Sequence, residues 1–184
     1  MTSPDTPLTP TERQGNWIFA NSLALLAIRL VLGWVFIYAG AQKLFGAFGG
    51  IGMETWTKVM ESDAMRMPVL PPAAWAYISA GGEFFGGIAV LLGVLTRLGA
   101  LPLIVTMCVA IAKAVGQNGF GGAMSKTDPG AVHPGYAYNL SLIAMSLALV
   151  LSGPGLISID ALIFKRGFWS RGPQPLDRPV SRVA

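Results

Sequence analysis

Four long apolar segments alternate with polar loops along the chain, and they cover residues 22–41, 73–95, 98–113 and 136–152. A helix of about 20 residues crosses the hydrocarbon core of a bilayer, because each residue advances it by about 1.5 Å. The first segment is interrupted only by Arg29, and the second carries a single charged residue within its apolar stretch, Glu83. The pattern predicts an all-α membrane protein built as a bundle of four transmembrane helices.

The loop after the first segment, residues 43–72, is too long to be a plain connection. Apolar residues follow helical spacing on one side of it and charged residues on the other, namely Met53, Trp56, Val59 and Met60 against Glu54, Lys58 and Glu61. This pattern predicts a short interfacial helix lying on the membrane surface.

A second short interfacial helix is predicted after the last segment. Gly153-Pro154-Gly155 breaks the chain there, and Ser158 or Asp160 can cap a helix over residues 161–168. The remaining connection, residues 116–135, is a glycine-rich loop that holds His133.

The two ends of the chain are polar. Residues 1–21 contain three prolines and predict a disordered tail, and residues 165–184 form a basic tail. Residues 22–164 are then one transmembrane domain. The rival interpretation of the first segment is a secretory signal peptide, because Ala39-Gly40-Ala41 resembles a cleavage site. The long polar leader and Arg29 argue against cleavage.

Composition strengthens the membrane interpretation. The chain is 53% hydrophobic and 12% charged, whereas soluble domains carry about 25% charged residues. The net charge of +4 does not indicate nucleic acid, because five of the thirteen cations lie in the last twenty residues, beside an apolar segment. Anionic lipid headgroups are the expected partner of that tail.

Lysines and arginines also predict the orientation in the membrane. Seven of them lie in the two tails and at Arg97, and five lie in the two longer loops and at the ends of the spans beside them. We therefore expect a multi-pass protein of the bacterial or archaeal inner membrane, with both termini in the cytoplasm. His133 would then face outward.

Cysteine and histidine counts exclude several kinds of site. Cys108 and His133 are each the single residue of their type. An intrachain disulfide, a thiolate cluster, bis-histidine haem ligation and histidine-rich metal sites are therefore excluded. We expect this chain to hold no metal and no haem by itself.

Glu83 and Arg29 are the charges placed deepest in the predicted bundle. A charged residue at the bilayer centre costs about 2.5–3.5 kcal/mol on insertion scales, so it faces either a charged partner or a functional cavity. Counted from the segment ends, the two backbones differ in depth by roughly 5 Å, which an arginine can bridge. The sequence leaves two interpretations open: an Arg29–Glu83 structural ion pair, or a site that also meets a ligand or proton.

Further polar residues gather near the outer ends of the predicted spans. They are Lys43, Lys113, Asn139 and Tyr136 or Tyr138. A lysine at this depth either binds a ligand or extends its ammonium to water. The five tryptophans lie mostly where interfacial anchors belong.

Several spaced motifs together resemble the DoxX family of membrane proteins. They are Arg29-x3-Gly33-x2-Phe36-x3-Gly40-x2-Lys43-Leu44-Phe45-Gly46, Glu83-x2-Gly86-Gly87, Leu91-x-Gly93-x2-Thr96-Arg97 and Gly153-Pro154-Gly155-x2-Ser158-x-Asp160. The resemblance covers all four predicted spans. It implies a four-helix membrane protein with Arg29, Lys43 and Glu83 as its polar core, and some members are subunits of thiosulfate:quinone oxidoreductase.

Two positions depart from the family pattern. Members often have a histidine near the end of the third span, where this chain has Lys113 and Gln117. They often have a glutamate at the start of the fourth span, where this chain has Tyr136, Tyr138 and Asn139.

The leading functional hypothesis is a membrane subunit of a quinone-linked oxidoreductase that provides a site for a quinone or a lipid-like ligand in the bundle and is not active alone. A quinone needs an apolar slot and donors to its carbonyls, and Glu83 would exchange protons with it. The candidate ligand-binding residues are Arg29, Lys43, Lys113, Tyr138 and Asn139. Expected partners are other redox subunits or further copies of this chain. The alternatives are a non-catalytic scaffold that recruits soluble redox proteins and, less favoured because no inverted repeat is evident, a small-solute carrier.

Overall fold

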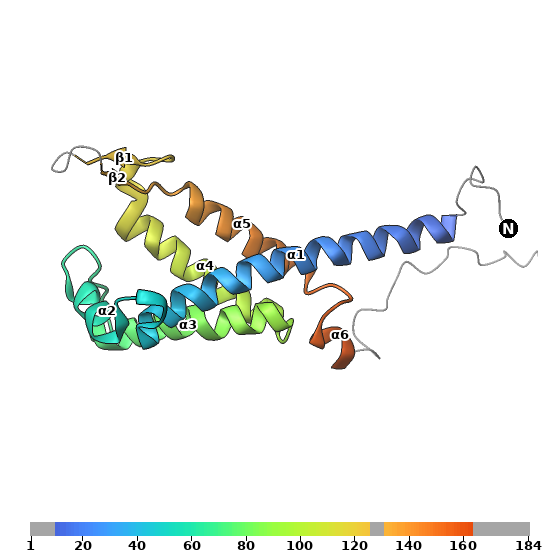
Figure 1. Ribbon diagram of the computed structural model, residues 1–184, viewed down its shortest axis with the longest axis horizontal. Helices are drawn as coiled ribbons and strands as arrows, with labels where there is room; N and C mark the ends of the chain where they lie inside the picture. The colour runs from blue at the N-terminus through green and yellow to red at the C-terminus, as the bar shows by residue number, and fades with distance from the viewer. Residues whose placement is uncertain (1–9, 126–130, 164–184) are drawn as a thin grey trace, which may run out of the picture.

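The computed structural model describes residues 10–125 and 131–163, and most of these residues are helical (Figure 1). The main helices are α1 (Pro10–Phe45), α2 (Gly52–Glu61), α3 (Pro72–Leu92), α4 (Thr96–Ala110), α5 (Ala137–Ser152) and α6 (Ile159–Ile163). Shorter elements are η1 (Ala47–Gly49), η2 (Ile111–Val115), η3 (Gly116–Asn118), β1 (Ala123–Met124) and β2 (Val132–His133).

Three helical stretches are long and apolar enough to cross a membrane: Gln14–Phe45, Pro72–Leu92 and Thr96–Asn118. α5 is also apolar but has 16 residues, or about 24 Å of helix against a hydrocarbon core of about 30 Å. The predicted all-α membrane fold is confirmed. A fourth span at α5 stays a prediction.

The structure corrects the N-terminal boundary of the first helix. Residues 1–21 were expected to be disordered, but α1 begins at Pro10 and its first part projects beyond α3 and α5 (Figure 1). Proline is well suited to the first turn of a helix, where its missing N–H has no intrahelical partner. Residues 1–9 lie outside the described residues.

Other boundaries shift by a few residues. The third predicted span, 98–113, corresponds to α4 and the π-helical turn η2, and the second ends at Leu92 rather than at residue 95. The interfacial helix in the first loop is α2. The helix after the last span covers Ile159–Ile163, while residues 164–184, including the basic tail, lie outside the described residues.

The glycine-rich connection contains a hairpin that the sequence did not predict. β1 and β2 pair antiparallel, with Ala123 opposite His133 and Met124 opposite Val132. His133 is exposed on this hairpin. α4 and α5 diverge from α1 and α3 toward it (Figure 1).

Glycines let α1 and α3 touch along their length. A Cβ atom added at Gly40 would lie 2.6 Å from the Phe84 nitrogen, and one at Gly33 would lie 2.8 Å from Leu91 Cβ. A Cβ atom at Gly87 would lie 2.8 Å from the Ile37 nitrogen. Small residues allow such close approach in membrane helix pairs, where packing rather than water exclusion drives association.

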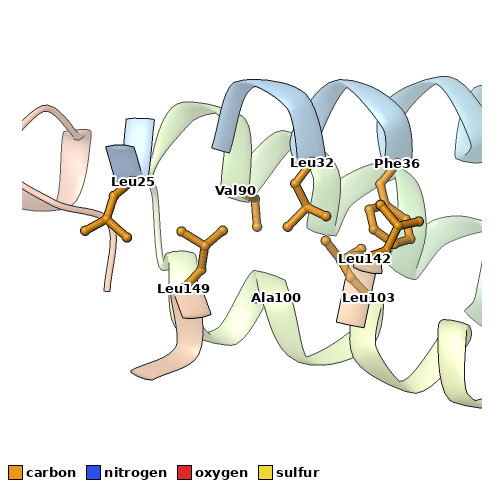
Figure 2. Close-up of a cluster of buried hydrophobic side chains, with 8 residues drawn as sticks. All are labelled: Leu25, Leu32, Phe36, Val90, Ala100, Leu103, Leu142 and Leu149. Carbon is orange, nitrogen blue, oxygen red and sulfur yellow. The ribbon is translucent and has the colours of Figure 1, made fainter. Parts of the chain in front are cut away.

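Side chains from four helices form one buried cluster (Figure 2). Its members are Leu25, Leu32, Phe36, Val90, Ala100, Leu103, Leu142 and Leu149. The cluster joins α1, α3, α4 and α5 and so fixes the helices that carry the polar residues.

Candidate functional site

Lys43 and Glu83 form the ion pair at one end of the helix bundle. Lys43 Nζ lies 2.5 Å from Glu83 Oε2, and the two side chains are 20% and 3% exposed. We call this end of the bundle the lysine end. The pair places a carboxylate and an ammonium among apolar helices. Part of the Lys43 side chain is exposed at the surface.

The predicted Arg29–Glu83 pair is therefore wrong. Close contacts pair Gly33 with Leu91 and Gly40 with Phe84, and this register places Glu83 level with Ala41 and Arg29 level with Leu95. The two levels differ by about 18 Å along the helix axis. The predicted depth of Arg29 was wrong because it was counted from a first helix that begins at Ser22. α1 begins earlier, at Pro10, and extends beyond the expected membrane boundary.

α2 covers the lysine end. Lys43 Nζ lies 4.6 Å from the centroid of the Trp56 ring, in cation–π geometry. Trp56 Nε1 donates a hydrogen bond of 3.0 Å to Ser79 Oγ, one turn before Glu83 on α3. From the sequence, Trp56 was predicted only as part of an interfacial face, and Ser79 was not predicted as part of a site. Ser79 precedes Glu83 by four residues, and this helical spacing could have indicated that the two side chains lie on the same face of α3.

Arg29 lies at the opposite end and is 2% exposed. Its guanidinium donates to four backbone oxygens, those of Val90, Leu91, Pro154 and Ile157, at 3.0, 3.0, 3.0 and 2.6 Å. Two of these carbonyls, those of Val90 and Leu91, lie in the last turn of α3, where few backbone N–H donors remain. The Val90 oxygen also accepts from the Gly93 nitrogen at 3.2 Å. We call this region the arginine end. Arg29 therefore ties α1 to the end of α3 and to the segment after α5.

Asp160 completes the arginine end. Its carboxylate accepts hydrogen bonds from the Leu95 and Thr96 backbone nitrogens, at 2.8 and 3.1 Å, and from Thr96 Oγ1 at 3.2 Å. Asp160 therefore caps α4 from a distant part of the sequence, while Ser158 accepts from the Ala161 nitrogen and caps α6. The sequence offered both residues as caps of the last short helix and missed the link to α4.

Two other predicted ligand-binding residues have separate surroundings. Lys113 is exposed and donates to the Arg66 carbonyl oxygen at 3.4 Å. Asn139 is 9% exposed, and its Nδ2 lies 3.2 Å from Met107 Sδ. The structure gives neither residue a hydrogen bond to Lys43 or Glu83.

Tyr138 lies in a cleft between α1 and α5. The cleft has a volume of about 450 Å³ and is lined by Trp34, Val35, Tyr38, Ala39, Gln42 and Tyr138. A second cleft, of about 480 Å³, lies between α2 and α3 and is lined by Met53, Glu54, Thr57, Lys58, Glu61, Ala73 and Tyr77. Sequence reasoning found Tyr138 but not the α1 residues opposite it.

The described residues contain no group of three His, Cys, Asp or Glu side chains able to hold a metal ion. Cys108 is exposed on α4.

Comparisons with known proteins identify the family. The DoxX family model matches residues 24–116. An uncharacterized membrane protein from Mycobacterium tuberculosis is 31% identical over 156 residues, covering 78% of this chain and 83% of its own. An uncharacterized protein from Haemophilus influenzae is 25% identical over 146 residues, covering 79% and 86%. No solved structure gives a significant match. The family match, the first relative and the long apolar helices together show that the chain belongs to the DoxX family of membrane proteins.

Proposed function

We propose that this protein is the membrane subunit of a quinone-linked oxidoreductase complex, similar to thiosulfate:quinone oxidoreductase. In this proposal the protein binds a quinone in the membrane, and a partner redox subunit delivers electrons. The observation that carries the proposal is the Lys43–Glu83 pair, buried at the lysine end of an apolar bundle. Intramembrane ionisable groups are costly to insert and commonly serve ligands or protons.

The residues of the pair suit proton handling. A bound quinone would accept two electrons and two protons. The Glu83 carboxylate can hold and release a proton, and Lys43 has three N–H donors, one of which points to Glu83. Because the Lys43 side chain is 20% exposed, it connects the buried carboxylate with the surface of the bundle.

The decisive measurement is quinone reduction by the assembled complex in membranes, with thiosulfate as donor. Rates are expressed per assembled complex, since variants at a buried pair can lower protein levels. Glu83→Gln keeps the side-chain shape but cannot hold a proton, and we expect at least a tenfold slower reduction. Lys43→Ala should weaken quinone binding by about 1–3 kcal/mol if its charge meets the ligand.

Lys58→Ala is the matched control, because Lys58 is an exposed cation of α2 whose partner, Glu54, lies on the same helix. It should leave the rate unchanged. Full activity in both Glu83→Gln and Lys43→Ala would return the ion pair to a structural role and overturn the proposal.

One observation favours a scaffold as the second candidate function. Lys43 and Glu83 satisfy each other, and Arg29 is satisfied by four carbonyl oxygens. A scaffold needs these charges only to hold the bundle together while its surface recruits redox proteins. It predicts loss of complex assembly, but not of the rate per assembled complex, in the ion-pair variants.

A further inference from the structure

We propose that the cleft between α1 and α5 is a binding site for the ring of a neutral, membrane-soluble quinone. The inference rests on the proposed function for the identity of the ligand. It places the ring beside the Lys43–Glu83 pair, against residues of which the sequence had indicated only Tyr138. Five of the six lining residues lie on one face of α1 and the sixth, Tyr138, comes from α5.

The lining changes in character along α1. Trp34 and Val35 are the lining residues furthest from the C-terminal end of α1. Gln42 lies about two turns closer to that end, about 12 Å from Trp34 along the helix axis. Ala39 contributes only a methyl group between larger neighbours, which leaves room for a ligand. A flat ring can therefore contact aromatic side chains while its polar atoms approach the glutamine.

The segment after α1 folds back and holds two of these side chains. The Phe48 ring stacks on Tyr38, with ring centroids 4.9 Å apart and an angle of 19° between the planes. Phe48 adopts a left-handed backbone with φ of 55°, which is unfavourable for a bulky residue. A Cβ atom added at Gly50 would lie 2.5 Å from Gln42 Cα, so the backbone of this turn packs closely against Gln42. Backbone strain of this kind concentrates at binding sites.

The polar groups of the cleft have no hydrogen-bond partner in the described part of the chain. Within residues 10–125 and 131–163, the structure gives no hydrogen bond to the Gln42 amide or to the hydroxyls of Tyr38 and Tyr138. An amide and two phenols offer N–H and O–H donors, which match the acceptor carbonyls of a quinone. The cleft contains the chemistry that the ligand requires.

Charge and exposure favour a quinone over a phospholipid. Among the described residues, no Lys, Arg, Asp or Glu lines this cleft, so these residues offer no charge to neutralise a phosphate. Trp34 and Tyr138 are each 59% exposed on apolar helices, so a tail attached to the ring can leave directly into the hydrocarbon. The volume of about 450 Å³ lies within the usual range for small-molecule sites. The α2–α3 cleft, with its three charged side chains, lacks this neutrality.

The cleft and the ion pair share the last turn of α1. Gln42 and Lys43 are consecutive residues near the end of the helix at Phe45. A ring held by Gln42 would therefore sit at the level of the proton-carrying pair.

The test is a titration of decylubiquinone into the full-length protein in phosphatidylcholine nanodiscs, followed by tryptophan fluorescence. We expect saturable quenching, most of which disappears in Trp34→Phe. Gln42→Leu and Tyr138→Ala should each raise the dissociation constant at least tenfold, and Tyr138→Phe, which keeps the ring, should raise it less. Tyr77→Ala is the control, because Tyr77 is 60% exposed and lines the other cleft. It should bind as the wild type does.

The outcomes separate this inference from the proposed function. Saturable binding that is unchanged in Gln42→Leu and Tyr138→Ala, in protein with wild-type circular dichroism, overturns the cleft and leaves the function standing. No saturable binding in the wild type overturns both. Binding lost in the cleft variants, together with full quinone reduction in Glu83→Gln and Lys43→Ala, supports the cleft and removes the ion pair from the mechanism. Loss of the quinone quenching when phosphatidylglycerol is added to the nanodiscs would identify a lipid site and overturn the inference.

Discussion

Lys43 and Glu83 depend on each other because both side chains lie largely out of water. Removing one partner of a buried pair leaves an uncompensated charge, which typically costs about 3–5 kcal/mol. Replacing both by apolar residues of similar volume is often close to neutral.

We therefore expect Lys43→Met and Glu83→Met each to lower the free energy of unfolding by about 3–5 kcal/mol, and the double variant to recover most of that loss. Unfolding in detergent, followed by circular dichroism, measures the three values. The Glu54–Lys58 pair is the control, because it is exposed on α2 and its variants should be nearly additive. Additive losses at Lys43 and Glu83 would show that the two charges act independently.

The residue types of the polar core were predictable from the sequence, but their pairing was not. Arg29, Lys43 and Glu83 were recognisable as charges within apolar segments. Which of them meet depends on the register of α1 against α3, and that register is set by the contacts of Gly33 and Gly40. Because a glycine stripe allows many registers, the spacing of the residues alone could not select the observed one.

At the scale of elements, α4 depends on a residue more than sixty positions away in the chain. Asp160 accepts hydrogen bonds from the backbone nitrogens of Leu95, which precedes α4, and of Thr96, its first residue. Nitrogens at a helix N-terminus have no partner within the helix. Leu95, just before α4, has a left-handed backbone with φ of 46°. The carboxylate therefore stabilises both a strained turn and a helix end.

We expect Asp160→Ala to destabilise this end of α4 by about 0.5–2 kcal/mol, as other capping losses do. Hydrogen exchange measured by mass spectrometry should then be faster in the peptide that contains Leu95 and Thr96. Asp63→Ala, which removes an exposed carboxylate between α2 and α3, should leave that exchange unchanged. Wild-type exchange in Asp160→Ala would mean that other groups hold the turn.

The long apolar helices and α2 were predictable because their hydrophobic patterns are strong and local. The packing of α2 over the lysine end was not predictable, because the apolar face that contains Trp56 could contact either lipid or Lys43. The β1–β2 hairpin has only two residues in each strand, too few for an alternating pattern to reveal.

At the scale of the whole molecule, α5 joins the two ends of the bundle. The hairpin before it follows α4, and α6 after it contacts the turn between α3 and α4 through Asp160. α5 therefore returns the chain toward the arginine end. This arrangement supports the prediction that α5 is a fourth span and that both termini lie on the same side.

Cysteine accessibility in intact cells tests this topology. On a Cys108→Ala background, His133→Cys should react with an impermeant thiol reagent, whereas Thr11→Cys and Leu162→Cys should react only after the membrane is opened. All three positions are exposed in the protein. Reaction of Leu162→Cys but not of Thr11→Cys from outside would show that α5 does not cross. Labelling of both ends but not of the hairpin would reverse the orientation.

The contacts of Arg29 also bear on how the protein is made. Its guanidinium and two of its acceptors, Pro154 and Ile157, are separated by 125 and 128 positions. During synthesis α1 therefore enters the membrane long before those two partners leave the ribosome. Until then a nascent chain carries an arginine that lacks part of its native hydrogen bonding. A chain that stops before residue 154 keeps this defect permanently, because its Arg29 lacks two of its four backbone acceptors.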